Sequence, residues 1–159
     1  MTIAFESIGL IRTPFTSLEG MPIQPKAAAG IKGKVILDKP FETGLADLDG
    51  FSHIILIYYL HKSVGFELKI TPFLDKTPRG VFSTRAPKRP NAIGMSVVKL
   101  TNIEENILYI ENVDMLDGTP LLDIKPYIPG FDTHETEKQG WIRDKTKDLT
   151  NIKSDKRFK

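Results

Sequence analysis

The stretch Arg79–Gly94 combines residue types that are suited to binding an anion. It holds four cations and no carboxylate: Arg79, Arg85, Lys88 and Arg89. Val81 to Thr84 begins like a strand, and Pro87 and Pro90 then fix an extended backbone without donating to a sheet. Arginine grips carboxylate or phosphate through paired donors, and a rigid loop loses little entropy on binding. The same charges would also keep a sheet edge from pairing, so an anion site and a solvated loop both remain open.

A second stretch, Asp114–Tyr127, gathers charges in an apolar context. Its charged residues fall within twelve positions: Asp114, Asp117, Asp123 and Lys125. Asp117-Gly118 is also a strong signal for a tight turn. Because buried charges need partners, Arg85 and Arg89 are expected to pair with these carboxylates.

Several common catalytic motifs are missing from the sequence. No Gly-x-Gly-x-x-Gly follows a strand, and there is no Walker phosphate loop and no Gly-x-Ser-x-Gly elbow. The three His lack metal-ligand spacing, so no metal is expected, and the absence of Cys excludes thiolate sites and disulfides. The residues alone therefore predict a site for an anionic or zwitterionic ligand and assign no reaction.

Composition places the chain among ordinary globular proteins. Its 159 residues suffice for one domain with a core, with 40% hydrophobic and 26% charged residues. No apolar run approaches the roughly 20 residues of a membrane span. The first residues lack the basic and apolar pattern of a signal peptide, so a cytoplasmic protein is expected.

Charge is distributed unevenly along the chain. The net charge is +2, yet residues 138–159 carry eight Lys or Arg and three Asp. We therefore divide the chain into a domain over residues 1–137 and a basic tail over residues 138–159. The tail predicts a polyanionic partner such as RNA, although a solubilising terminus has the same composition.

Strand signals are many and short, whereas helical periodicity is scarce. Strands are expected within Ile3–Ile11, Ala27–Leu37, Phe51–His61, Met95–Leu100 and Ile107–Val113. The apolar run Phe51–His61 predicts a central strand buried on both faces, and the last two strands predict a hairpin. A short amphipathic helix is expected from Thr133 onward, carrying Trp141. The pattern predicts an all-β fold, either a barrel or a sandwich.

Four runs of this sequence resemble the TsaA-like family, also called TrmO. They are Ile8–Phe15, Phe51–Ile55, Phe82–Met95 (Phe-Ser-Thr-Arg-Ala-Pro-Lys-Arg-Pro-Asn-Ala-Ile-Gly-Met) and Asp114–Tyr127. Four long motifs in the same order make the resemblance specific. It implies a small single-domain β-barrel that binds S-adenosylmethionine near a homodimer interface. It also implies methylation of the exocyclic nitrogen of N6-threonylcarbamoyl-adenosine, beside the anticodon of certain tRNAs.

The resemblance also implies site residues. Those matching cofactor contacts are Gln24, Pro25, Lys26, His61, Lys62, Arg85, Met95, Leu116, Asp117, Gly118 and Thr119. Those matching catalytic or supporting positions are Arg89, Asn91, Asp123, Lys125 and Tyr127. This chain reads Ile23-Gln-Pro-Lys26 where family members usually read Pro-Arg-Gln. Bacterial members continue into a further C-terminal domain, and the basic tail stands in that place here.

Methyl transfer to a carbamoylated nitrogen benefits from a general base, and Asp117 is the expected one. Arg85 or Arg89 is expected to orient an anionic group of the substrate. Two other interpretations remain open: a non-catalytic module that binds S-adenosylmethionine or RNA, and a methyltransferase with a different acceptor.

Overall fold

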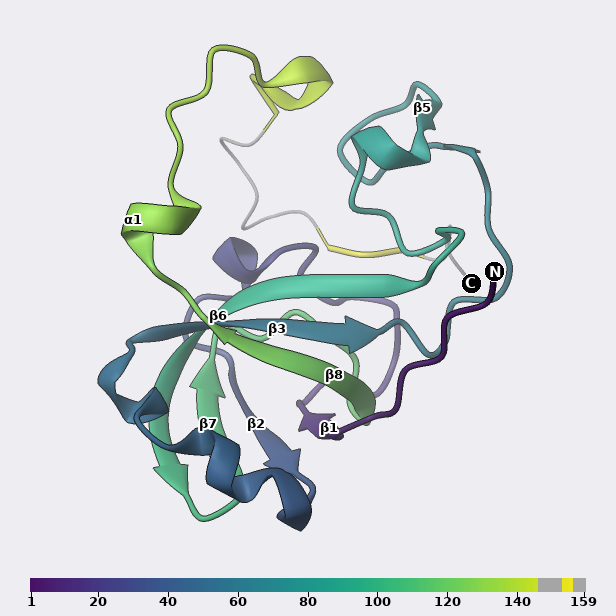
Figure 1. The fold of residues 1–159 in the computed structure, drawn as a ribbon. Helices are drawn as coiled ribbons and strands as arrows, with labels where there is room; N and C mark the ends of the chain where they lie inside the picture. Colours follow the sequence, from purple (N-terminus) through teal and green to yellow (C-terminus); the bar gives the residue numbers. More distant parts are fainter. Residues whose placement is uncertain (146–152, 156–159) are drawn as a thin grey trace.

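Six antiparallel strands close into a small barrel in the computed structural model, which describes residues 1–145 and 153–155 (Figure 1). The strands are β1 (Gly9–Arg12), β2 (Lys32–Leu37), β3 (His53–Tyr59), β6 (Ile93–Glu104), β7 (Ile107–Glu111) and β8 (Thr119–Pro126). Around the barrel they follow the order β1–β2–β7–β6–β3–β8, and β1 pairs with β8 to close it. The expected small all-β barrel is confirmed.

Alternating side chains fill the barrel interior. In β3, Ile54, Leu56 and Tyr58 are buried, whereas Ile55 and Ile57 lie on the outer face and remain partly exposed. The prediction that this strand is buried on both faces is wrong, because a barrel strand turns only one face toward the core. The buried core residues are Ile11, Val35, Leu37, Ile54, Leu56, Tyr58, Val98, Leu100, Leu108, Ile110, Val113, Met115 and Leu121.

The predicted hairpin is confirmed in β6 and β7. The two strands pair in antiparallel register and are joined at Glu105 and Asn106, where Glu105 adopts a φ of 51°. A register shift between Leu100 and Asn102 bends β6, which is the longest strand. The first part of β6 pairs with β3, and the last part pairs with β7.

Short turns replace regular structure near the N-terminus. Only β1 forms within Ile3–Ile11, and the Ser7 hydroxyl donates locally to the Gly9 carbonyl. The predicted strand over Ala27–Leu37 is also shorter, because η1 (Pro25–Ala28) precedes β2 and Gly30 turns with a φ of 76°. Two further 3₁₀ turns connect β2 to β3: η2 (Lys39–Leu45) and η3 (Leu48–Gly50).

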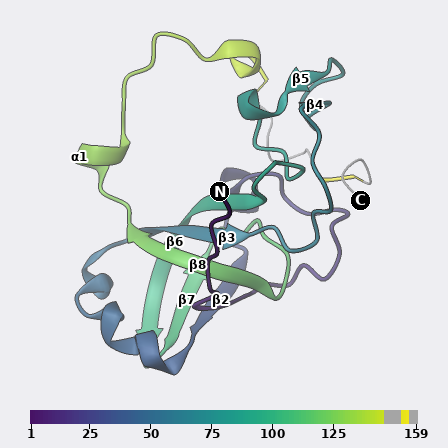
Figure 2. The ribbon, with the colours of Figure 1, turned by 45° about the vertical axis from the view of Figure 1, so that its right-hand side comes forward.

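Between β3 and β6 the chain leaves the barrel over residues 60–92 (Figure 2). This excursion holds β4 (Lys69–Ile70), β5 (Arg79–Gly80) and η4 (Val81–Ser83), and it packs Ile70, Val81 and Ala86 into a small core of its own. The predicted strand at Val81–Thr84 is wrong, because the Thr84 amide and hydroxyl both donate to the Val81 carbonyl and close a turn.

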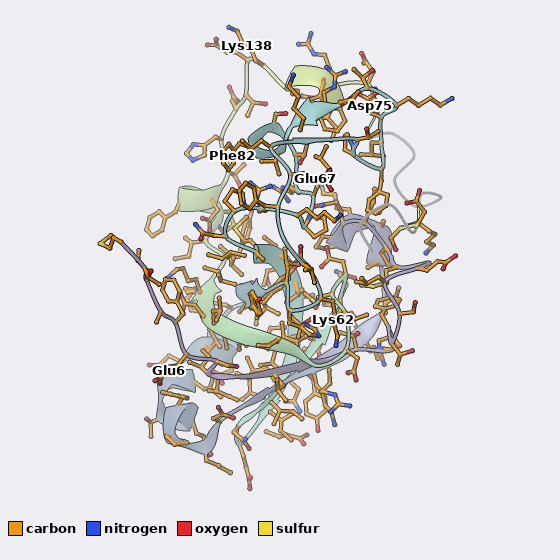
Figure 3. The ribbon with its side chains drawn as sticks, turned by 90° about the vertical axis from the view of Figure 1, so that its right-hand side faces the viewer. Glu6, Lys62, Glu67, Asp75, Phe82 and Lys138 are labelled. Carbon is orange, nitrogen blue, oxygen red and sulfur yellow. The ribbon has the colours of Figure 1, made fainter. Side chains whose placement is uncertain are left out.

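Residues 141–145, near the C-terminus, contact this excursion through hydrogen bonds. Asp75 accepts hydrogen bonds from Arg79 Nη2 and Lys145 Nζ, each at 2.8 Å, and these bonds lower the pKa of Asp75. Trp141 Nε1 donates to the Ser83 carbonyl at 2.8 Å. Figure 3 shows Asp75 at the end of the molecule opposite Glu6.

The predicted helix from Thr133 is wrong. One turn, α1 (Pro129–Asp132), precedes that position, and Trp141 lies in the single 3₁₀ turn η5 (Gly140–Ile142). Gly140 has a φ of 60°, a left-handed conformation that a regular helix does not accommodate. Of the predicted basic tail, the structure describes residues 138–145 and 153–155, and the remainder lies outside the described residues.

Candidate functional site

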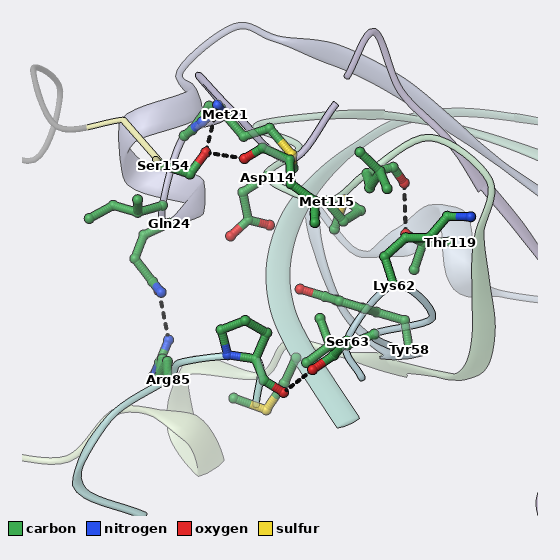
Figure 4. Close-up of a pocket in the computed structure, with 18 of the residues that line it drawn as sticks. Met21, Gln24, Tyr58, Lys62, Ser63, Arg85, Asp114, Met115, Thr119 and Ser154 are labelled. Atoms are coloured by element: carbon green, nitrogen blue, oxygen red, sulfur yellow. Dashed lines mark hydrogen bonds between the residues drawn. The ribbon is translucent and has the colours of Figure 1, made fainter. Parts of the chain in front are cut away.

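A pocket of about 340 Å³ opens where the excursion meets the barrel (Figure 4). Its volume lies in the range of small-molecule sites. The walls come from the loop before η1, the ends of β3 and β6, the cationic loop, and the segment between β7 and β8. The main lining residues are Met21, Ile23, Gln24, Tyr58, Leu60, His61, Lys62, Arg85, Arg89, Ile93, Met95, Asp114, Met115, Leu116, Thr119 and Ser154.

A chain of hydrogen bonds links the barrel interior to a carboxylate in the pocket wall. Ser96 Oγ donates to Asp114 Oδ1 at 2.7 Å, and Tyr58 Oη lies 2.9 Å from Ser96 Oγ. Because the single Ser96 proton goes to Asp114, the Tyr58 hydroxyl donates to Ser96. Both Tyr58 and Ser96 are buried, so they hold Asp114 in one orientation.

Gly94 makes room for this arrangement. It lies directly opposite Tyr58 in the β3–β6 pairing. A Cβ atom at this position would fall closer than 3.0 Å to the Tyr58 ring. Glycine therefore lets the ring lie across β6 with its hydroxyl directed at Ser96.

Burial sets the protonation behaviour of the pair. It raises the pKa of Asp114 to about 6, against the opposing effects of the Ser96 hydrogen bond and the Arg85 charge. Burial and the Asp114 charge likewise raise the pKa of Tyr58. Asp114 can therefore gain and lose a proton close to neutral pH, as a general base must.

Two cations, Arg85 and Lys62, also line the pocket. Arg85 Nη1 donates to Gln24 Oε1 at 3.0 Å, which ties the cationic loop to the loop before η1 (Figure 4). Lys62 is exposed at the rim. Burial and the Lys62 charge lower the pKa of His61, so its imidazole is neutral near pH 7. Together with the carboxylate of Asp114, these cations give the pocket both signs of charge, which suits a zwitterion.

Arg89 shapes the cationic loop from within. Its Nη1 donates to the carbonyls of Val81 at 3.1 Å and Thr84 at 2.9 Å, and its guanidinium lies 5.8 Å from the centre of the Phe82 ring. Arg89 also lines the pocket. Its hydrogen bonds to the loop backbone indicate that it supports the position of Arg85.

The structure brings eight of the predicted site residues to the pocket and leaves the others outside its walls. Those in the pocket wall are Gln24, His61, Lys62, Arg85, Arg89, Met95, Leu116 and Thr119. Those not lining it are Pro25, Lys26, Asn91, Asp117, Gly118, Asp123, Lys125 and Tyr127.

Asp117 is engaged away from the pocket. Its Oδ1 accepts from Arg12 Nε at 2.8 Å and from the Thr13 amide at 3.0 Å. Burial alone would raise the pKa of Asp117, but these hydrogen bonds outweigh it and lower the pKa. Gly118 follows with a φ of 73° and donates its amide to the Ile11 carbonyl. These contacts are those of a turn that leads into β8 and is hydrogen-bonded to the end of β1.

The expected pairing of the carboxylates with Arg85 and Arg89 is wrong for Asp117 and Asp123, whereas Asp114 accepts a hydrogen bond from Ser96 and interacts with Arg85 through its charge. Asp117 pairs with Arg12, and Asp123 pairs with Lys125 at 2.7 Å. The reason is register, since Asp123 and Lys125 lie opposite the outward-facing residues of β3. Tyr127 lies just beyond β8, with its hydroxyl 3.2 Å from Thr133 Oγ1.

Sequence reasoning missed Tyr58, Ser96, Met21 and Ser154 altogether, and it noted Asp114 only as a charge. The signal for Asp114 was present, because an Asp before Met-Leu in an apolar region needs a partner. Its partner Ser96 lies on another strand, within an ordinary strand pattern.

Within residues 1–145 and 153–155, no three His, Asp or Glu side chains gather as a metal site. In the same part of the chain, no helix is long and apolar enough to cross a membrane.

Comparisons with known proteins identify relatives. Residues 10–133 match the family model described as the tRNA-methyltransferase O N-terminal domain. A probable S-adenosyl-L-methionine-binding protein of Pyrococcus abyssi is 46% identical over 158 residues, which cover 99% of this chain and 86% of that protein. The tRNA (adenine(37)-N6)-methyltransferase of Mus musculus is 40% identical over 136 residues, which cover 80% of this chain and 31% of that protein.

Solved structures agree with the fold and with the family. A crystal structure of TrmO matches with a TM-score of 0.76 at 39% identity, over 88% of this chain and 64% of the other. TrmO from Pseudomonas aeruginosa matches with a TM-score of 0.75 at 37% identity, over 89% of this chain and 63% of the other. The chain thus spans about a third of the mouse enzyme and under two thirds of these TrmO chains. The family match includes the six barrel strands and most of the pocket wall, and the chain belongs to the TrmO family, whose N-terminal domain it matches.

Proposed function

We propose that this protein is an S-adenosylmethionine-dependent methyltransferase acting on N6 of an adenosine in tRNA. The observation that carries the proposal is Asp114. It is a carboxylate held by Ser96 in the wall of a pocket that Arg85 and Lys62 also line, in a chain of the TrmO family. The relatives named as tRNA (adenine(37)-N6)-methyltransferases support the reaction, and the Pyrococcus abyssi relative supports the cofactor.

The pocket suits the cofactor. Met21, Leu60 and Met115 give it apolar walls, which can accept an adenine ring and a thioether chain. Gln24 and Arg85 offer donors for the carboxylate of the amino-acid tail, and the neutral His61 can accept from its ammonium group. When bound there, S-adenosylmethionine supplies an electrophilic methyl group.

Asp114 is the general base in this proposal, in place of Asp117. A carboxylate with a pKa near 6 is largely ionised at pH 7 and still basic enough to take the N6 proton. Ser96 fixes the orientation of the carboxylate, and Tyr58 fixes Ser96 in turn. The reaction then depends on positioning, which rigid neighbours in the barrel wall provide.

The acceptor is proposed to be N6-threonylcarbamoyl-adenosine, as the family resemblance implies. Its threonyl group carries a carboxylate, and Arg85 has donors left beyond the one that it gives to Gln24. The basic tail is proposed to contact the tRNA backbone. A tRNA substrate would place the reaction in the cytoplasm, as expected from the sequence.

A homodimer is part of the proposal. Ile93 and Met95 are exposed on β6 yet line the pocket, and Tyr59 is exposed opposite Ile93. A second copy covering these apolar side chains would also close the pocket. Sedimentation equilibrium tests this: Tyr59→Glu is expected to yield monomers from a wild-type dimer, and a monomeric wild type would contradict it.

The cofactor is tested by isothermal titration calorimetry with S-adenosylmethionine. Saturable binding with one site per chain is expected, and Arg85→Ala should weaken it at least tenfold. Absence of binding to the wild type would overturn the proposed function. The runner-up is a non-catalytic S-adenosylmethionine-binding module, favoured by the name of the Pyrococcus abyssi relative. It predicts binding without methyl transfer to any tRNA.

A further inference from the structure

Part of the pocket wall comes from beyond the family match. The match ends at residue 133, whereas Ser154 and Asp155 line the pocket. We call residues 153–155 the strap. It lies beside the loop that leads from Leu18 to Gln24, more than 130 residues away in the sequence.

The strap pairs with this loop through an isolated antiparallel β-bridge and neighbouring backbone hydrogen bonds. Lys153 forms an antiparallel bridge with Pro22. The Ser154 amide donates to the Met21 carbonyl at 2.9 Å, and the Ser154 carbonyl accepts from the Gly20 amide at 2.9 Å. Backbone contacts alone would therefore let many residue types occupy position 154.

The Ser154 side chain adds contacts that few residue types could make. Its Oγ accepts from the Met21 amide at 2.8 Å and donates to the Leu18 carbonyl at 2.6 Å (Figure 4). The hydroxyl thus satisfies a donor and an acceptor of the same loop. Without it, both backbone groups would need new partners.

The Leu18–Gln24 loop contributes residues to the pocket wall, among them Met21 and Gln24. Met21 is buried, with 6% of its surface exposed, and Gln24 bonds to Arg85 across the pocket mouth. Gly20, at the start of the loop, has a φ of 80° and no Cβ to limit its backbone. A loop of this kind loses considerable entropy when a ligand orders it, unless it is already held.

We propose that Ser154 is a positioning residue of the cofactor pocket, and that the strap preorganises the Leu18–Gln24 loop for S-adenosylmethionine. The inference rests on the proposed function for the identity of the ligand. It assigns to a segment outside the family match a role in cofactor affinity. Because the hydrogen bonds of Ser154 within the described residues all go to the loop, the strap acts on the ligand through Met21 and Gln24.

Calorimetry with S-adenosylmethionine on full-length variants tests the proposal. Ser154→Ala should weaken binding about tenfold, whereas Ser154→Thr keeps a hydroxyl and should stay within threefold of the wild type. Ser83→Ala is the matched control, because Ser83 Oγ also donates to a carbonyl, that of Gly80, but lies outside the pocket wall. It should bind like the wild type.

Hydrogen exchange of the Met21 amide, measured without ligand, gives a second readout. The amide should be protected in the wild type and in Ser154→Thr, and it should lose protection in Ser154→Ala. If Ser154→Ala binds as tightly as the wild type, the positioning role is overturned while the cofactor site stands. If the wild type binds no S-adenosylmethionine, the proposed function fails instead. A Met21 amide that is unprotected in the wild type would overturn the strap itself.

Discussion

Asp114 Oδ1 accepts a hydrogen bond of 2.7 Å from Ser96 Oγ, which joins the buried face of β6 to the pocket wall. The acceptor lies just before a tight turn, and the donor lies near the start of the longest strand. Their contact holds one half-buried carboxylate in a fixed orientation close to the proposed cofactor site. The first two predictions test what this carboxylate does.

The pH dependence of stability should report the burial of Asp114. Its pKa is about 6 in the folded protein against an ordinary value of 3.8, so the folded state binds the proton more tightly than the unfolded state does. Proton binding by Asp114 therefore contributes most to the stability of the folded state below about pH 4, and this contribution is lost as the pH rises through 6. Asp114→Asn removes this loss and should raise the free energy of unfolding at pH 8 by about 1–2 kcal/mol relative to wild type. Urea unfolding at pH 5 and pH 8 measures it, and an equal effect at both values would speak against a buried, raised carboxyl.

Asp114 and Asp117 should behave differently in catalysis. Asp114→Asn should reduce methyl transfer at least a hundredfold and remove the decline in rate below pH 6, while S-adenosylmethionine still binds. Asp117→Asn should keep turnover within about threefold and cost about 1 kcal/mol of stability, because it weakens the contacts with Arg12 and Thr13. Single-turnover rates from pH 5 to 9 distinguish the two. The opposite pattern would restore Asp117 as the base.

Gly94 should tolerate no side chain. Gly94→Ala places a methyl group against the Tyr58 ring, which must then move away from Ser96. We expect a loss of about 1–3 kcal/mol in the free energy of unfolding, together with a clear loss of methyl transfer. Gly44→Ala is the matched control, since no atom lies within 4 Å of a Cβ there. Equal stabilities for the two variants would show that the ring has room to adapt.

The basic tail should set the salt dependence of tRNA binding. Replacing Lys156, Arg157 and Lys159 with Gln leaves the strap sequence intact and removes three positive charges. If these residues neutralise phosphates, the slope of log affinity against log salt concentration should flatten by up to about 2–3 units. Fluorescence anisotropy with labelled tRNA measures the slope, and calorimetry should give unchanged cofactor affinity. An unchanged slope would assign tRNA binding to the barrel and the excursion.

Local patterns predicted the parts of this molecule that local physics controls. The hairpin of β6 and β7, the turn at Asp117-Gly118 and the all-β class follow from alternation and turn residues, whereas the choice of a barrel over a sandwich came from the family resemblance. The prediction that β3 is buried on both faces was wrong, because Ile55 and Ile57 lie on the outside of the barrel although their residue type usually indicates a core. The effect of Gly140 on the predicted helix could not be foreseen either. A single glycine is compatible with both negative and positive φ, and the sequence does not show which one it adopts.

The site was harder to predict because its contacts are distant in sequence. Gln24 and Arg85 were both expected at the site, and they are hydrogen-bonded across 61 positions. Ser96, Tyr58 and Ser154 gave no local signal, since each occupies a position where its residue type is common. Asp117 was expected to be the base, but it pairs with Arg12 and so lies away from the pocket. This pairing arises from the closure of β8 onto β1, which the sequence alone does not reveal.

The central claim is most directly tested by transfer of tritium from methyl-labelled S-adenosylmethionine to tRNA. Two preparations of one tRNA are compared, with and without threonylcarbamoyl-adenosine beside the anticodon, each with wild type and Asp114→Asn. The account predicts label in the modified tRNA with the wild-type protein, and little or none in the other three reactions. Label entering unmodified tRNA equally would contradict the proposed acceptor. No label in any tRNA, from a wild type that binds the cofactor, would contradict the methyltransferase itself.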